Sequence, residues 1–358
     1  MPQLLLDETS PYGTRRASLL QGDHDLYLFL ADATSADAGT VSTVWVANTS
    51  AAPGALDRSG TAAGAPPRMG ADGTLHPQGC PPPNGAMRLV WFEEGDGVAL
   101  VDADGVIAAI PGWGGVDGFY GYARHARGQT PLAWELSGPV QAALGEKVEA
   151  SRAFWQARTA VGAWDTLRAQ GVAHLEQRLG PVDHSWSLNE TQFPELVLTR
   201  HRVAAGSGTV FVTATTGLSA QRMAGVEQAV EDPSTCSRIE LAFGRRVADE
   251  AAAAVLADVA RIPSSRCTFL GDGHTVGGRP GAYAVFGPDK TALLLTSTPP
   301  AGPDGGPAPD LRGRTVGGDA VLPLWVIPVD DATAGIARAN GGPAALAHLA
   351  SQGVGWLS

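Results

Sequence analysis

The sequence has little lysine, little cysteine and no long apolar run. Only two of its 25 basic residues are lysines, and with abundant alanine this skew indicates a GC-rich bacterial genome. The net charge is −11, and no basic cluster extends beyond pairs such as Arg15-Arg16. A phosphate-binding surface needs clustered basic residues, so nucleic acid is not expected as a partner.

The three cysteines, Cys80, Cys236 and Cys267, are odd in number, widely spaced and without a Cys-x-x-Cys pair. This pattern indicates neither a zinc site nor a thioredoxin-like site. It favours a chain with reduced cysteines, and a single disulfide is the alternative. No stretch approaches the roughly 20 apolar residues of a membrane span, and the N-terminus lacks the apolar core of a signal peptide. We therefore expect a cytoplasmic protein that does not bind membranes.

Length and composition predict two globular domains. The 358 residues are 44% hydrophobic and 17% charged, as in folded soluble domains, and exceed one ordinary core. Residues 1–184 are predicted as a β-rich domain closed by two helices within 139–180, and residues 185–358 as a second domain. The expected fold class is α+β, each domain having a mainly antiparallel or mixed sheet with helices on one side.

The first half contains short runs of β-branched and aromatic residues that predict strands. Residues 98–110 predict a hairpin, because Asp104-Gly105 supplies a tight turn between two apolar runs. The Asp-x-Asp-Gly string there also suggests calcium, but the other ligands of an EF-hand are absent. The loop 48–85 is unusually long, which indicates a functional or mobile segment. The other strands are expected at 26–30, 41–47 and 88–93.

The second half alternates predicted strands and helices. Asp249 is placed to cap a helix over 249–262, and a last helix is expected over 343–351. The string 205–208 is interpreted as a hairpin turn, and the loop 299–310 as a flexible excursion. Strands are expected at 196–203, 209–216, 237–243, 282–286, 291–297 and 321–329.

No catalytic constellation is recognisable. The eight histidines are scattered and none forms a His-Glu-x-x-His pair; His76 is interpreted as a turn or packing residue. Glu93, Glu94 and Asp96 form an acidic cluster, interpreted as a solvated strand end, with an acid–base pair as the alternative. Ser207 lacks the Gly-x-Ser-x-Gly elbow. We therefore predict no catalytic residue, no metal site and no cofactor.

Two segments contain candidate partner-binding residues. Trp113, Phe119, Tyr120 and Tyr122 lie in a glycine-rich loop beside Arg124, and interface hot spots favour Trp, Tyr and Arg. The alternative is that these aromatic rings fill the domain core. Asp272 and His274 share a second tight loop and are interpreted as a turn and a strand start, with partner contact as the alternative.

Six ordered segments of the second half carry a family resemblance. Over residues 187–356 the sequence resembles the bacterial suppressor of fused domain. The first half is similar to the region that accompanies this domain in longer bacterial members, on strings such as LVWFEEGDGVALVDADG (89–105). The six segments are TQFPELVL (191–198), VFVTATTGLSAQRM (210–223), SRIELAF (237–243), FLGDGHTV (269–276), ALLLTS (292–297) and LPLWVIPVDDA (322–332).

The resemblance implies a scaffold that binds protein. The eukaryotic relative sequesters Gli transcription factors, but the N-terminal half here departs from it, so Gli binding is not carried over. Bacterial members commonly lie beside polymorphic toxin genes, which implies an immunity protein that neutralises a toxin. The acidic charge is compatible with a basic toxin domain, and strand addition at a sheet edge is one mode of binding.

The competing hypothesis is an enzyme or a small-ligand-binding protein. It would use a pocket between the two domains, with Glu93, Glu94 or His274 as acid–base groups.

Overall fold

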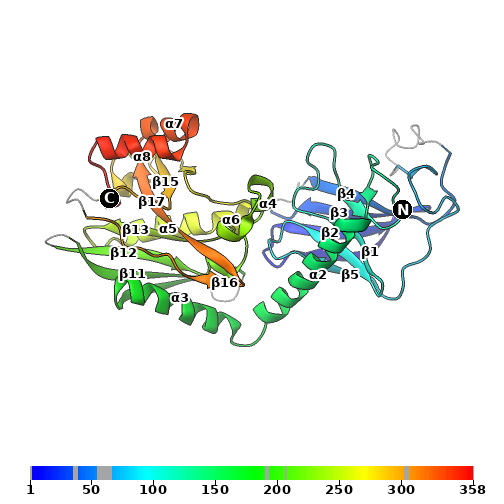
Figure 1. Ribbon diagram of the computed structural model, residues 1–358, viewed down its shortest axis with the longest axis horizontal. Coiled ribbons are helices and arrows are strands. Elements are labelled where there is room, and N and C mark those ends of the chain that lie inside the picture. Colours follow the sequence, from blue (N-terminus) through cyan, green and yellow to red (C-terminus); the bar gives the residue numbers. More distant parts are fainter. Residues whose placement is uncertain are drawn as a thin grey trace. The chain divides into compact units, whose positions relative to one another are not determined.

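A computed structural model describes residues 2–34, 39–54, 67–189, 193–205, 208–301 and 306–357 (Figure 1). The chain divides into two compact units, Met1–Ala160 (unit 1) and Val161–Ser358 (unit 2). The boundary predicted from the sequence lies later, after the second helix. In the structure that helix, α3 (Ala163–Leu179), belongs to unit 2, because its Leu175 and Leu179 are buried against strands of that unit.

Unit 1 contains two sheets and one long helix. The first sheet is an antiparallel meander of four strands, and the second has five strands, of which the last pair is parallel. Helix α2 (Gly138–Arg158) follows them. The strands are β1 (Gln3–Thr9), β2 (Arg15–Gln21), β3 (Asp25–Asp32), β4 (Thr40–Asn48), β5 (Arg88–Trp91), β6 (Val98–Asp102), β7 (Gly105–Ile110), β8 (Tyr122–Ala123) and β9 (Trp134–Glu135).

The second sheet of unit 1 is buried on both faces. Side chains alternate across a strand, and along β6 Leu100 packs with Trp45 of the first sheet. The neighbouring Ala99 belongs to another cluster with Val148 of α2. This three-layer packing explains why β6 is apolar throughout. The predicted turn at Asp104-Gly105 is confirmed, with Gly105 at a φ of 105°.

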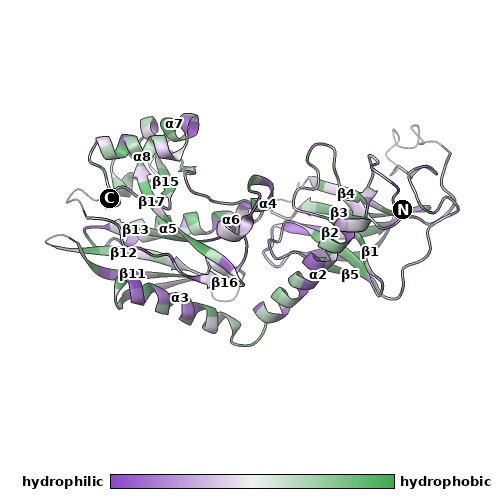
Figure 2. Cartoon of the chain, in the orientation of Figure 1, coloured by the Kyte–Doolittle hydropathy of each residue, from purple (hydrophilic) through white to green (hydrophobic). Residues whose placement is uncertain are grey.

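Unit 2 is built on an eight-stranded mixed sheet, in which β16 pairs with one end of β17. The pair β13–β17 is parallel and the others are antiparallel. Hydrophobic residues extend along β17, near the middle of the sheet (Figure 2). The strands are β10 (Val182–Asn189), β11 (Leu196–Ala205), β12 (Gly208–Thr216), β13 (Arg238–Arg245), β14 (Thr275–Gly277), β15 (Ala292–Thr296), β16 (Thr315–Val316) and β17 (Asp319–Val329).

Helices cover both faces of this sheet. Leu256 of α5 packs with Ile239 on one face, and Leu175 of α3 packs with Val212 on the other. The α+β class is confirmed, but the expectation of helices on one side only is wrong for unit 2. Its helices include α4 (Val226–Ala229), α5 (Glu250–Ala260), α6 (Ile262–Arg266), α7 (Asp331–Asn340) and α8 (Gly342–Ser351), with the short 3₁₀ helices η1 (Leu218–Ala220), η2 (Pro233–Thr235) and η3 (Ala284–Phe286).

Most predicted elements of unit 2 are present. The Asp249 carboxylate caps α5 by accepting from the backbone N–H groups of Ala251 and Ala252, at 3.0 and 3.1 Å. The strand predicted over 282–286 is wrong: this segment ends in η3, whose hydrogen bonds are local, as from Phe286 N to Tyr283 O. The elements that the sequence did not predict include helices α4, α6 and α7 and strands β1, β2, β8, β9, β10 and β16.

Three predicted loops lie partly outside the described residues. These are the turn at Gly206-Ser207, part of the loop 48–85 and part of the loop 299–310. The three cysteines, all within the described residues, are not joined by a disulfide bond. Among the helices that the structure describes, none is both long and apolar enough to span a bilayer.

Candidate functional site

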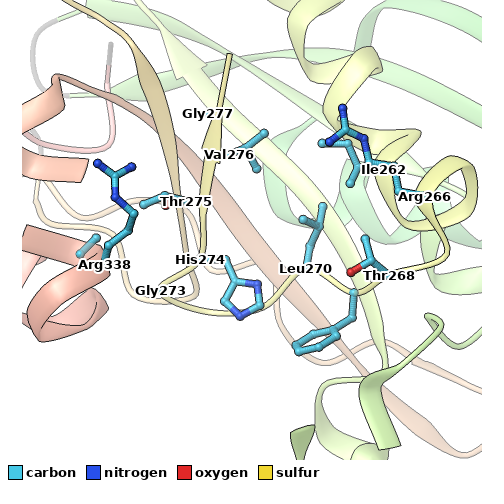
Figure 3. A pocket seen from close by; sticks show the side chains of 12 residues that line it. Ile262, Arg266, Thr268, Leu270, Gly273, His274, Thr275, Val276, Gly277 and Arg338 are labelled. Atoms are coloured by element: carbon cyan, nitrogen blue, oxygen red, sulfur yellow. The ribbon is translucent and has the colours of Figure 1, made fainter. Parts of the chain in front are cut away.

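Unit 2 carries an open groove of about 670 Å³ beside β14 (Figure 3). Strand β14 lies between two helices of the groove wall: Ile262 and Arg266 come from α6, and Ala337 and Arg338 from α7. The segment 268–270 closes the groove between α6 and the turn that precedes β14. The groove therefore runs along the whole of β14, and both the strand backbone and the side chains of the two helices can contact a bound molecule.

β14 is an edge strand of the eight-stranded sheet. It pairs with β15, and the structure shows no second strand beside it among the described residues. Leu295 N donates to His274 O at 2.8 Å, so the N–H of the following residue, Thr275, points away from β15. Backbone groups alternate sides along an antiparallel strand, so Gly277 also points outward. The free edge of β14 thus presents donors and acceptors that suit another strand.

A tight turn fixes the start of β14. Gly273 has a φ of 82°, which favours glycine. A Cβ on Gly342 would lie only 2.5 Å from Gly273 Cα, so the turn and α8 approach too closely for side chains. The Asp272 carboxylate accepts from Ser297 N at 2.8 Å and Ser297 Oγ at 3.0 Å. Asp272 therefore anchors the turn to the residue that follows β15, in agreement with its interpretation from the sequence as a turn residue.

His274 lines the groove itself. Its Nδ1 accepts from Gly271 N at 3.2 Å, which assigns the proton of the neutral ring to Nε2. Burial lowers the pKa of His274, so the ring is neutral at pH 7. It packs against Phe269, with ring centroids 5.1 Å apart. A neutral imidazole with one N–H donor is suited to hydrogen bonding in a binding site.

Two arginines give the groove a positive character. Arg266 and Arg338 are exposed on opposite sides of β14 (Figure 3). Neither guanidinium makes an ion pair or hydrogen bond with another of the residues described. Between them the floor is apolar, with Leu270 buried and Val276 half-buried. The groove thus matches an extended segment that carries apolar side chains and carboxylates.

The aromatic loop of unit 1 divides between core and surface. Phe119 is 6% exposed, and its ring lies 4.8 Å from those of both Tyr122 and Trp134. Tyr120 is 39% exposed and Trp113 is half-buried. Phe119 and Tyr122 therefore follow the core-filling alternative, and Tyr120 and Trp113 reach the surface.

Arg124 is engaged within unit 1. Its Nη1 and Nη2 donate to the two Asp102 carboxylate oxygens at 3.0 and 2.8 Å, and its Nε donates to Val106 O at 3.0 Å. The guanidinium holds the β6–β7 hairpin together. It is not available as a surface anchor.

The interpretation of residues 93–96 as a solvated strand end is wrong. Glu94 and Asp96 are buried. Lys147 of α2 lies 3.4 Å from Glu94 Oε1, and its Nζ lies over the Phe92 ring. The turn after β5 folds beneath α2, so the cluster is part of the packing between sheet and helix. His76 packs edge-on against His125, with ring centroids 4.9 Å apart.

The sequence did not identify Arg266 and Arg338 as site residues. They are far apart in the chain and no local pattern connects them; only the approach of α6 and α7 to β14 brings them to one groove. No cluster of three or more histidine, cysteine or acidic residues able to hold a metal occurs in the described part of the chain.

Comparison with known protein families gives a match for unit 2. The family model of the suppressor of fused protein (SUFU) matches residues 199–358, which include the groove and most of unit 2. No curated protein and no solved structure matches the chain. A domain of this family suggests a protein-interaction role. Residues 199–358 are therefore similar to the suppressor of fused family, which confirms the resemblance carried by the sequence motifs of the second half.

Proposed function

We propose that this protein acts by binding another protein, without catalysis, and that it takes up an extended segment of its partner along β14. The observation that carries the proposal is the outer edge of β14, which pairs with no strand of the described residues and opens into a groove with an apolar floor. Strand addition at such an edge needs only main-chain donors and acceptors, and side-chain pockets supply specificity. The suppressor of fused domain supports the same class of function.

The net charge of the chain and the local charge of the groove favour different features of a partner. The net charge of −11 favours encounter with a basic partner domain, since opposite fields speed association. Within the groove, Arg266 and Arg338 favour carboxylates on the captured segment. We propose a partner with a basic surface and a short extended segment bearing acidic and apolar residues.

We further propose that the partner is a toxin domain and that the protein is a cytoplasmic immunity protein. The support is the occurrence of bacterial members of the family beside polymorphic toxin genes, together with the acidic charge. The protein would then neutralise its toxin by covering it.

Thr275→Pro is expected to weaken partner binding about tenfold or more, because it removes one outward N–H and crowds an incoming strand. Proline is tolerated on an edge strand where the N–H faces away from the sheet, so the fold should persist. Thr275→Ala is the matched control, since it alters the side chain and keeps the N–H.

The partner is recovered by affinity purification from cells that also express the product of a toxin gene adjacent to this one. Titration calorimetry then compares the two variants with the wild type. Equal affinity of Thr275→Pro and Thr275→Ala would exclude strand addition at β14. Failure to recover any stoichiometric protein would count against the proposed function itself.

A further inference from the structure

Unit 1 contains a cavity of about 550 Å³ that the proposed function does not use. It lies among the ends of β1, β2, β3 and β4 and the β6–β7 hairpin. Leu26, Val46 and Ile107 give it apolar walls. Its volume is within the range of sites for small organic molecules, which are mostly apolar with a few directed polar groups.

A proline-rich strap, residues 80–84, lines one side of this cavity. Cys80 N donates to Asn48 O at 2.8 Å, which ties the start of the strap to the end of β4. At its other end Asn84 N donates to Asp102 Oδ2 at 3.0 Å, and Ala103 N donates to Asn84 O at 3.0 Å. Between these anchors the chain reads Pro81-Pro82-Pro83. Prolines fix φ and carry no N–H, so the strap is a preformed, rigid wall without donors.

Two of the charged groups at the cavity, Asp102 and Arg124, neutralise one another. Asp102 accepts from Arg124 Nη1 and Nη2 and from the backbone N–H groups of Asn84 and Asp104. Its side chain is fully buried. Asp104 is exposed at the rim, where it accepts from Asn84 Nδ2 at 2.8 Å. Burial raises the pKa of the Cys80 thiol, which keeps it protonated. The buried Asp102–Arg124 pair therefore adds no net charge to the cavity, and the carboxylate of Asp104 lies at its exposed rim.

His125 also lines the cavity, and its ring takes no part in the hydrogen bonds of Asp102 and Arg124. It is 8% exposed, and neither ring nitrogen has a hydrogen-bond partner among the described residues; its contact is the edge of the His76 ring. Burial lowers its pKa to about 4, so at pH 7 one nitrogen is an acceptor and the other a donor. A ligand in the cavity that reaches the ring would supply the hydrogen-bond partner that it lacks among the described residues.

We infer that the cavity of unit 1 binds a small, uncharged organic molecule with an apolar body and one hydrogen-bonding group directed at His125. The walls supply the apolar contact, the strap supplies a preformed shape, and the imidazole orients the ligand. The site lies wholly within unit 1, so it does not depend on the groove of unit 2 or on any protein partner.

The probe for this site is N-phenyl-1-naphthylamine, an uncharged, fluorescent molecule with one N–H group. The full-length protein is expected to bind one equivalent with a saturable increase in fluorescence. Gln21→Trp places an indole at a half-buried cavity-lining position and is expected to weaken binding about tenfold or more, or 1.4 kcal/mol. Leu4→Trp is the matched control, because Leu4 lies in β1, is 52% exposed and does not line the cavity.

His125→Phe tests the orienting role. The ratio of affinities for N-phenyl-1-naphthylamine and 1-phenylnaphthalene, which lacks the N–H, is expected to be about 2- to 10-fold in the wild type and to approach one in the variant. Absence of saturable binding to the full-length protein, or equal binding to Gln21→Trp and Leu4→Trp, overturns the inference. An unchanged ratio in His125→Phe overturns the assignment of His125.

Discussion

Asp319→Ala is expected to lower the free energy of unfolding of unit 2 by about 3–5 kcal/mol, the range for breaking a buried ion pair. Asp319 is 4% exposed. Its carboxylate accepts from Arg222 Nε and Nη2 and from Arg238 Nε, each at 2.8 Å. The Arg238 side chain is only 4% exposed. Alanine leaves that guanidinium buried without its nearest carboxylate.

The same contacts give the effect a pH dependence. Burial acts to raise the pKa of Asp319, but hydrogen bonds from Arg222 and Arg238 outweigh it and lower the pKa. Because the folded-state pKa lies below the unfolded value of about 3.9, the stabilisation is complete above that value and is lost as the pH falls through the folded pKa. The difference between variant and wild type should therefore be smaller at pH 3 than at pH 7.

Urea unfolding followed by circular dichroism measures this loss, with Asp258→Ala as the control. Asp258 belongs to an exposed pair with Arg261, and such pairs contribute about 0–1 kcal/mol. A loss at Asp319 no larger than the loss at Asp258 would mean that the buried network does not stabilise the sheet.

Trp45→Ala is expected to destabilise unit 1 by about 3–5 kcal/mol, as large-to-small changes of buried aromatic residues do. Trp45 is fully buried in the cluster that joins the two sheets of unit 1. Its Nε1 donates to Asn48 Oδ1 at 3.0 Å, and Asn48 Nδ2 donates to Met69 O at 2.8 Å. The substitution both opens a cavity and removes the partner of a buried amide oxygen.

The control is Trp113→Ala, the same chemical change at a half-buried loop position. Thermal unfolding should show a much larger decrease in midpoint for Trp45→Ala than for Trp113→Ala. Similar decreases would contradict the assignment of Trp45 to the core between the sheets.

Local sequence patterns predicted much of the fold. The Asp104-Gly105 turn, the Asp249 cap and the alternating strand 237–243 each depend on neighbouring residues, and each is present. The strand predicted over 282–286 had the right composition but lacks a partner strand, and its backbone closes local hydrogen bonds instead. The residue composition of a segment does not determine whether another strand lies beside it in the fold.

The site was less predictable because it depends on contacts between distant segments. From its neighbours in the sequence, Glu94 is predicted to be a solvated acid. In the structure Lys147, 53 residues later in the chain, contacts it. Arg124 is likewise a candidate surface residue from its sequence context, but in the structure it forms an ion pair with Asp102. His274 was singled out by its loop, but the groove that it lines needs α6 and α7, which only the folded chain brings to β14.

Amide hydrogen exchange by NMR at β14 tests the central claim most directly, in the free protein and in its complex with the recovered partner. Val276 faces β15 and should be protected in both states. The outward amides of Thr275 and Gly277 are expected to exchange readily in the free protein and at least about tenfold more slowly in the complex, because they become hydrogen-bonded. Unchanged exchange at Thr275 and Gly277 in a saturated complex would contradict binding along this strand.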